Sequence, residues 1–246
     1  MKALIKPNPG PGAELATVPL PPMGPRDVLV RVKAAAICGT DVHIYDWTPY
    51  AQARVKPPMA FGHEFCGEVL EVGPNVTKVK PGDLIAGETH IPCEHCFLCE
   101  TGLQHICKDM KILGVHIPGV FSEYAVIPET IAWKIPPDTP PTVGAVLEPI
   151  GVGVHAVYAA DVRGANVLIT GSGPIGLAAI GVAKALGAQR VIATDISEKR
   201  LEFAKQWGAD VTLNVKTEDV VEVARSLTQG LGVDVAIEAS GVPSAI

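Results

Sequence analysis

Hydrophobic positions follow two different rhythms along the chain, and the change falls near residue 150. Before it, short apolar runs alternate with Pro and Gly punctuation, at 27–33, 68–72, 83–86 and 121–127. Short strands separated by turns are typical of an antiparallel β domain. The pattern therefore predicts a barrel-like β domain over residues 1–150.

After residue 150, apolar runs alternate with helical patterns. Strands are expected at 166–170, 190–194, 211–215 and 233–237. Helices are expected at 174–186, at 197–207 with Ser197 as the cap, and at 218–227. Alternating strands and helices predict βαβ units and a parallel sheet, so the fold class is α/β. Four strands precede Ile246, whereas a complete dinucleotide-binding sheet has six, so we expect residues 151–246 to form an incomplete Rossmann domain.

Composition and charge narrow the function classes. The chain has 246 residues, of which 48% are hydrophobic, and this apolar content excludes a disordered chain. A net charge of −6 without a basic stripe disfavours nucleic acid and anionic membranes as partners. No apolar run reaches the length of a membrane span, and the first residues lack a secretory signal. We therefore expect a soluble, cytoplasmic protein with a small-molecule substrate.

A glycine-rich motif, Gly171-Ser-Gly173-Pro-Ile-Gly176, lies between a predicted strand and a predicted helix. In a dinucleotide-binding site, such glycines permit a tight turn, close approach of the backbone to pyrophosphate, and close packing of helix on sheet. Asp195 ends the next strand, where a carboxylate can bind ribose hydroxyls and repel a 2′-phosphate. This favours NAD over NADP, although the nearby Arg200 weakens the preference. The alternative is that Asp195 is an ordinary polar turn residue.

Four of the six cysteines are closely spaced, as Cys93-x2-Cys96-x2-Cys99-x7-Cys107. Disulfides are improbable without a signal peptide, and the bacterial iron–sulfur pattern requires a different fourth spacing followed by proline. A zinc ribbon would need two distant pairs. The spacing therefore predicts a closed structural zinc site within a lobe at about 88–112, so chemistry must occur elsewhere.

A second set of residues combines the ligand types of a catalytic zinc. Cys38 follows one predicted strand, and His63-Glu64 begins another. A cysteine, a histidine and a carboxylate leave one coordination position for water or substrate. By residue type alone, the histidines at 90, 95, 105, 116 and 155 are equally plausible ligands; we interpret them as surface or core residues. Cys66 is interpreted as a small core residue.

The order of these features resembles the zinc-dependent medium-chain alcohol dehydrogenases. Segments 38–47, 62–69 and 87–91 are similar to the branch that oxidises L-threonine. The resemblance implies a GroES-like fold for the first domain and a homotetramer. It implies the following roles: Cys38, His63 and Glu64 at the catalytic zinc, Thr40 and His43 as a proton relay, Glu148 as an assisting acid, and Ile175, Asp195 and Arg200 at the cofactor. One departure is Val152-Gly153, where a polar Asn-Ala pair is expected.

The activity implied by the resemblance is oxidation of the secondary alcohol of L-threonine to 2-amino-3-oxobutanoate. NAD⁺ would accept the hydride, and each subunit would hold two Zn²⁺ ions, one catalytic and one structural. A polyol dehydrogenase that shares His63-Glu64 is an alternative enzyme. The third possibility is a structural protein that binds zinc and dinucleotide without catalysis, against which the intact set of Cys38, His63 and Glu64 argues.

Overall fold

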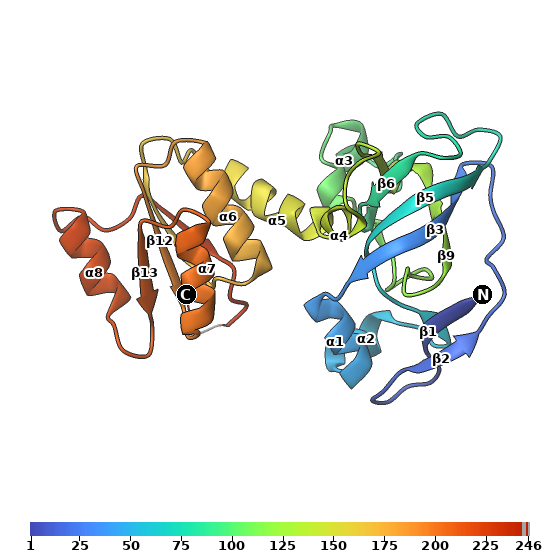
Figure 1. Ribbon diagram of the computed structural model, residues 1–246, viewed down its shortest axis with the longest axis horizontal. Helices are drawn as coiled ribbons and strands as arrows, with labels where there is room; N and C mark the ends of the chain where they lie inside the picture. Colours follow the sequence, from blue (N-terminus) through green and yellow to red (C-terminus); the bar gives the residue numbers. More distant parts are fainter. Residues whose placement is uncertain (243–244, 246) are drawn as a thin grey trace. The chain divides into compact units, whose positions relative to one another are not determined.

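Two units, Met1–Glu148 and Pro149–Ile246, divide the chain (Figure 1). The structure is a computed structural model and describes residues 1–242 and 245. The division falls within helix α5 (Leu147–Tyr158), close to the change of hydrophobic rhythm in the sequence. Each unit has a hydrophobic core of its own.

The first unit is built on a five-stranded antiparallel sheet. Its strands, in the order in which they pair, are β10 (Ala132–Lys134), β6 (Leu84–Gly87), β5 (Glu64–Val72), β3 (Asp27–Ala36) and β9 (Tyr124–Pro128). Every second residue at the start of β3 is buried, so Val28 and Val30 pack into one core with Phe65 and Ile85. The apolar runs of the sequence thus form the predicted antiparallel β domain.

Smaller elements surround this sheet. A second sheet consists of β2 (Glu14–Thr17), β1 (Lys2–Lys6) and β4 (Met59–Ala60). Two helices, α1 (Gly39–Asp46) and α2 (Pro49–Arg54), follow β3 and contact one another (Figure 1). The remaining elements of this unit are β7 (His90–Ile91), α3 (Phe97–Glu100), η1 (Gln104–Ile106), β8 (Lys111–Ile112), η2 (Glu129–Ile131) and α4 (Pro141–Gly144).

The second unit is a parallel sheet covered by helices on both faces. Its strands pair in the order β13 (Val211–Asn214), β12 (Arg190–Asp195), β11 (Asn166–Thr170) and β14 (Val235–Glu238). Alternate residues of β12 face opposite ways: Val191 packs with residues of α6 (Pro174–Ala185) and α7 (Glu198–Gln206), whereas Ile192 packs with α8 (Val220–Leu227). This arrangement confirms the predicted α/β class and the parallel sheet.

One predicted helix boundary is confirmed, and two other predicted boundaries shift for identifiable reasons. Ser197 occupies the cap position of α7, but its side chain makes no cap bond; its N–H donates to Asp195 instead. Helix α8 begins later than expected because Asp219 caps it, accepting the N–H groups of Val221 and Glu222. Strand β14 begins after Asp234, whose carboxylate accepts the N–H of Asn166 at the start of β11.

The helices are short. The two longest, α5 and α6, have 12 residues each, whereas a bilayer requires about 20 apolar residues. Within the part of the chain that the structure describes, no helix is long and apolar enough to cross a membrane.

Candidate zinc and nucleotide sites

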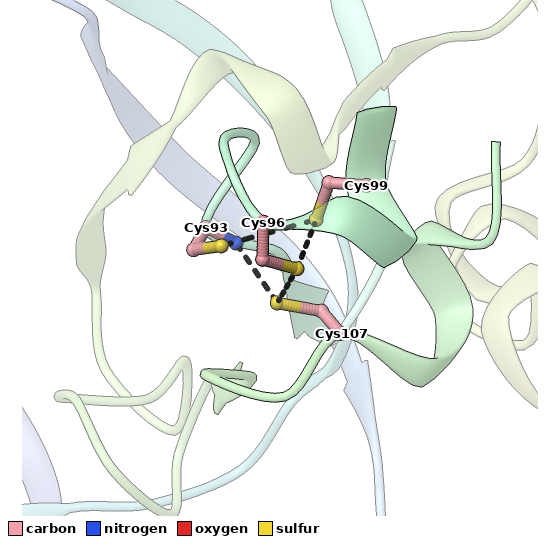
Figure 2. Close-up of side chains that lie close together, drawn as sticks. All are labelled: Cys93, Cys96, Cys99 and Cys107. Atoms are coloured by element: carbon pink, nitrogen blue, oxygen red, sulfur yellow. Dashed lines mark hydrogen bonds between the residues drawn. The ribbon is translucent and has the colours of Figure 1, made fainter. Parts of the chain in front are cut away.

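The four closely spaced cysteines converge in a lobe between the paired strands β7 and β8 (Figure 2). The Sγ atoms of Cys96 and Cys99 are 3.5 Å apart, and those of Cys96 and Cys107 are 3.9 Å apart. The Cys93 and Cys99 sulfurs are also separated by 3.9 Å. Cys96, Cys99 and Cys107 are buried, so the sulfur cluster is largely withdrawn from solvent.

These separations fit a metal and exclude disulfides. A tetrahedral site with Zn–S bonds of about 2.3 Å has sulfur atoms about 3.8 Å apart, whereas a disulfide places them about 2.05 Å apart. Hydrogen bonds, first from the backbone of Cys99, lower the pKa of the Cys96 thiol to about 6, whereas burial raises that of Cys99 to about 12. A bound dication would stabilise all four as thiolates, so the lobe fits a closed zinc site.

The second candidate zinc site is assembled by strand pairing. Ala36, the last residue of β3, pairs with Glu64, the first residue of β5. This register brings Cys38, two residues beyond β3, beside His63 and Glu64, and the ligand atoms of the three lie within 4.8 Å of one another. The structure thus brings together the three residues that the sequence pointed to.

The donor atoms of this site favour a cation. His63 and Glu64 are buried, and burial lowers the pKa of His63 to about 4, so its imidazole is neutral and able to ligate a metal. Burial also raises the pKa values of the Cys38 thiol and the Glu64 carboxyl. A nearby dication would reverse both shifts, because it stabilises thiolate and carboxylate.

Asp41 supports this site, and the sequence analysis did not identify it. One carboxylate oxygen accepts the Cys38 N–H at 2.9 Å, and the other lies 3.7 Å from Nδ1 of His63. Both Asp41 Oδ1 and His63 Nδ1 are buried without a hydrogen-bond partner. A carboxylate behind a histidine ligand orients the ring and increases its basicity. The available signal was the Cys38-x-x-Asp41 spacing of a capping box at the start of α1.

Helix α1 also carries the two residues expected to form a proton relay. The Thr40 hydroxyl is hydrogen-bonded to the Cys38 thiol and so lies at the edge of the candidate zinc site. His43 lies almost one turn further along the helix and is exposed. Its Nδ1 is 3.2 Å from Oγ1 of Thr48. The helix therefore leads from the metal-ligand cluster towards solvent.

Three further side chains gather beside the candidate catalytic site. Glu88, His90 and Glu148 have ligand atoms within 4.8 Å of one another. Burial, and then repulsion from Glu88 and Glu64, raises the pKa of Glu148 to about 7. His90 Nδ1 lies 2.7 Å from Glu88. The sequence analysis interpreted His90 as an ordinary histidine and missed Glu88, although both lie in the segment 87–91 that carried the resemblance.

The glycine motif of the second unit has the form of a phosphate cradle. Gly171 has a φ of +89°, and a Cβ there would lie 2.7 Å from the backbone of Ser240. A Cβ on Gly176 would collide with the Gly171 carbonyl oxygen, whereas one on Gly173 would meet nothing within 4 Å. Gly173 caps α6, so Ile175 lies in the first turn of that helix. Open backbone at a helix N-terminus fits a pyrophosphate.

Asp195 is held in place at the end of β12. Its carboxylate accepts the N–H groups of Ser172 and Ser197, each at 2.9 Å. Burial acts to raise the pKa of Asp195, but these hydrogen bonds and Arg200, whose Nη1 is 3.6 Å away, leave it below its usual value. The motif therefore carries an oriented, ionised carboxylate on the strand next to the glycines.

The unexpected glycine in Val152-Gly153 has a packing reason. A Cβ at Gly153 would lie 2.7 Å from the Cβ of Ala178 and 2.9 Å from the carbonyl oxygen of Ile175. Helix α5 therefore approaches α6 too closely for the alanine that was expected at this position. Nothing in the structure explains Val152, which is exposed.

Comparisons with known proteins agree with this architecture. Residues 24–137 match the alcohol dehydrogenase GroES-like domain, and residues 174–246 match the zinc-binding dehydrogenase family. The chain is 51% identical to the L-threonine 3-dehydrogenase of Symbiobacterium thermophilum, over 100% of this chain and 70% of that protein.

Two solved structures are similar over almost the whole chain. Galactitol-1-phosphate dehydrogenase from Escherichia coli has a TM-score of 0.90 and 32% identity, covering 100% of this chain and 70% of that one. A zinc-binding dehydrogenase from Sinorhizobium meliloti 1021, bound to NADP, has a TM-score of 0.91 and 35% identity, covering 99% and 71%.

Proposed function

This chain belongs to the zinc-binding alcohol dehydrogenases, in the branch of the L-threonine 3-dehydrogenases. We propose how its residues carry out the oxidation of L-threonine. The reaction is oxidation of the secondary alcohol of L-threonine to 2-amino-3-oxobutanoate, with NAD⁺ as the hydride acceptor. The structural observation that carries the proposal is the convergence of Cys38, His63 and Glu64 beside an acidic cluster.

The two clusters support two zinc sites with different tasks. Cys38, His63 and Glu64 would hold a catalytic Zn²⁺, and Cys93, Cys96, Cys99 and Cys107 would hold a structural one. When bound, the catalytic ion would act as a Lewis acid and lower the pKa of the substrate alcohol. Asp41 faces Nδ1 of His63, so it would fix the orientation of that ring.

The proton of the substrate alcohol leaves through helix α1. Thr40 lies at the zinc-ligand cluster and His43 almost one turn away, towards solvent. The Thr40 hydroxyl would take the substrate proton while passing its own to the imidazole of His43. This is general base catalysis by a positioned side chain, which commonly contributes 10²–10⁴ to the rate.

The acidic cluster suits the ammonium group of an amino acid. Glu148 has a pKa of about 7 because it is buried and repelled by Glu88 and Glu64. A substrate ammonium beside Glu148 and Glu88 would offset this repulsion and satisfy the carboxylates. We therefore assign Glu148 to substrate binding next to the zinc. In this proposal it is not a fixed ligand of the metal.

The second unit would bind the dinucleotide. The open backbone at Gly173 and the first turn of α6 would receive the pyrophosphate, and Asp195 would bind the adenosine ribose. NAD⁺ would accept the hydride, and the protein would align the cofactor with the substrate. Asp195→Ser should reduce the preference for NAD⁺ over NADP⁺ by roughly tenfold, because a charged acceptor and a repulsive charge are both removed. Steady-state kinetics with both cofactors would contradict this assignment if the preference did not change.

Assembly and location remain predictions from the resemblance. We propose a homotetramer that works in the cytoplasm. Sedimentation equilibrium of the purified enzyme would test the tetramer, and a dimer or monomer at micromolar concentration would contradict it.

A polyol dehydrogenase is the second candidate, because galactitol-1-phosphate dehydrogenase shares the fold at a TM-score of 0.90. The test is kcat/KM with NAD⁺ for L-threonine, 2-butanol, 2,3-butanediol and sorbitol. A site that pairs charged substrate groups should prefer threonine to 2-butanol by several orders of magnitude, since these partners are otherwise left unpaired. Sorbitol turning over faster than threonine would replace the proposal with the polyol activity. Equal rates for threonine and 2-butanol would eliminate the ammonium site.

A further inference from the structure

Thr48 stands where a helix cap is expected, yet its hydroxyl is used elsewhere. It is the N-cap residue of α2, a position at which threonine commonly accepts an N–H of the first turn. Its side chain makes no such bond, and Pro49 is the first helical residue. The hydroxyl oxygen instead lies 3.2 Å from Nδ1 of His43, across the turn between α1 and α2.

The turn that presents Thr48 to His43 is fixed by the backbone. Trp47 adopts the left-handed conformation, with φ of 57°, and its N–H donates to the carbonyl oxygens of His43 and Ile44. Gln52 donates from its side chain to the Trp47 carbonyl at 2.8 Å. The buried Lys6 donates to the Tyr45 carbonyl at 3.0 Å. These bonds hold the end of α1 independently of the Thr48 side chain.

An aromatic ring borders His43 on another side. The Tyr50 and His43 ring centroids are 5.8 Å apart and inclined by 40°. The Arg54 guanidinium lies 4.3 Å from the Tyr50 centroid. The imidazole therefore has a hydroxyl at Nδ1 and a ring beside it, which leaves Nε2 as the nitrogen available for proton transfer.

We propose that Thr48 is a positioning residue that fixes the tautomer of His43, with the proton on Nδ1 and the lone pair on Nε2. The proposal rests on the proton relay proposed above. Nε2 can accept a proton only if it carries none, so in the tautomer that serves the relay Nδ1–H donates to the Thr48 hydroxyl oxygen, 3.2 Å away. As the Thr40 O–H bond breaks, the Nε2–H bond forms, and Thr40 takes the proton of the substrate alcohol. The imidazolium then loses a proton to water.

The test compares Thr48→Val, which keeps the shape of the side chain without the hydroxyl, with Thr48→Ser, which keeps the hydroxyl. Imidazole ¹⁵N chemical shifts, assigned with His43→Gln, report the tautomer directly and do not depend on turnover. We expect the Nδ1–H form in the wild type and Thr48→Ser, and a mixture of tautomers in Thr48→Val. With Thr48→Val, kcat should fall roughly tenfold at unchanged KM for threonine, a fraction of what a general base supplies.

Gln52→Ala is the matched control, because it removes one hydrogen bond of the same turn, while the bonds from the Trp47 N–H and from Lys6 still hold the end of α1 and His43 is not touched. It should leave both the ¹⁵N spectrum and kcat unchanged. The proposal is overturned if Thr48→Val retains the wild-type tautomer, or if Gln52→Ala reproduces its effects. A changed tautomer with unchanged kcat would overturn the relay itself, while leaving the threonine activity and the contact between Thr48 and His43 in place.

Discussion

In the lobe between β7 and β8, four cysteines from one short loop converge on one another. In the site at the end of β3, a cysteine, a histidine and a glutamate come from two segments that only the pairing of β3 with β5 brings together. The lobe is chemically uniform, and its sulfur separations match a closed tetrahedron. The other site is mixed, and Asp41, Thr40 and Glu148 surround it with polar groups.

We propose that this difference distinguishes a site whose metal would stabilise the fold from a site whose metal would take part in the reaction. The lobe lies outside the five-stranded sheet, and three of its cysteines form a small cluster of their own, so a metal there would substitute for a hydrophobic core. The β3–β5 site lies on a sheet whose core is already filled by residues such as Val28, Phe65 and Ile85. Removing ligands should therefore affect stability at the first site and turnover at the second.

The largest expected effect is on turnover. Cys38→Ser should lower kcat/KM for threonine by roughly 10³ or more, because Lewis-acid stabilisation contributes several kcal/mol, while the melting temperature changes by only a few degrees. NAD⁺ reduction, zinc content and thermal unfolding would be measured on one preparation. Cys66→Ala is the control: this buried cysteine of β5 is outside both clusters, so activity per folded molecule should persist. Wild-type turnover by the Cys38→Ser enzyme would contradict the proposal that Cys38 holds a zinc ion needed for the reaction.

The opposite signature is expected in the lobe. Cys96→Ser should lower the melting temperature by roughly 10 °C or more, since structural zinc sites contribute directly to folding. One zinc per subunit should be lost, and activity per folded molecule should stay near that of the wild type. Calorimetry together with metal analysis would check this. A variant that keeps both its melting temperature and its lobe zinc would show that the cysteines are not structural ligands.

Asp41→Asn tests whether the catalytic site depends on more than its ligands. The amide can still accept the Cys38 N–H, so α1 should keep its capping bond, but the charge facing His63 is lost. Carboxylates behind histidine ligands typically contribute 10–100-fold to metal affinity or activity. We expect a loss of that size in kcat/KM or in resistance to a zinc chelator. A change below twofold in both would assign Asp41 to capping alone.

The same contrast explains what could be predicted from the sequence. The Cys₄ lobe and the glycine motif depend on spacing within one segment, and local spacing is visible in a single chain. The catalytic set depends on strand register: Ala36 opposite Glu64 cannot be read from either segment alone. Residue types suggested Cys38, His63 and Glu64, but only the resemblance separated His63 from the other histidines. Asp41 was missed because His63, which it faces, lies in another segment, and Glu88 was missed because Glu148, the third member of its cluster, is distant in sequence.

The smallest effect is expected from the ion pair between Glu94 of the lobe and Arg26, which precedes β3. Removing this ion pair tests whether the lobe is stabilised by its metal or by its contact with Arg26. Glu94 lies between two of the cysteines and pairs with Arg26 at 2.8 Å, with side chains that are 41% and 51% exposed. Exposed ion pairs of this kind contribute little and are screened by salt. Arg26 also retains a second partner, Glu129, at 3.4 Å.

Glu94→Ala should therefore change the melting temperature by only about 1–2 °C and leave zinc content and turnover unchanged. Glu94→Gly should be slightly more stable than Glu94→Ala, since Glu94 has a φ of 65° that glycine adopts without strain. Thermal unfolding at low and high salt would measure both variants beside Cys96→Ser. If Glu94→Ala were as destabilising as Cys96→Ser, the lobe would be stabilised by its ion pair with Arg26. The interpretation of the lobe as a structural metal site would then be wrong.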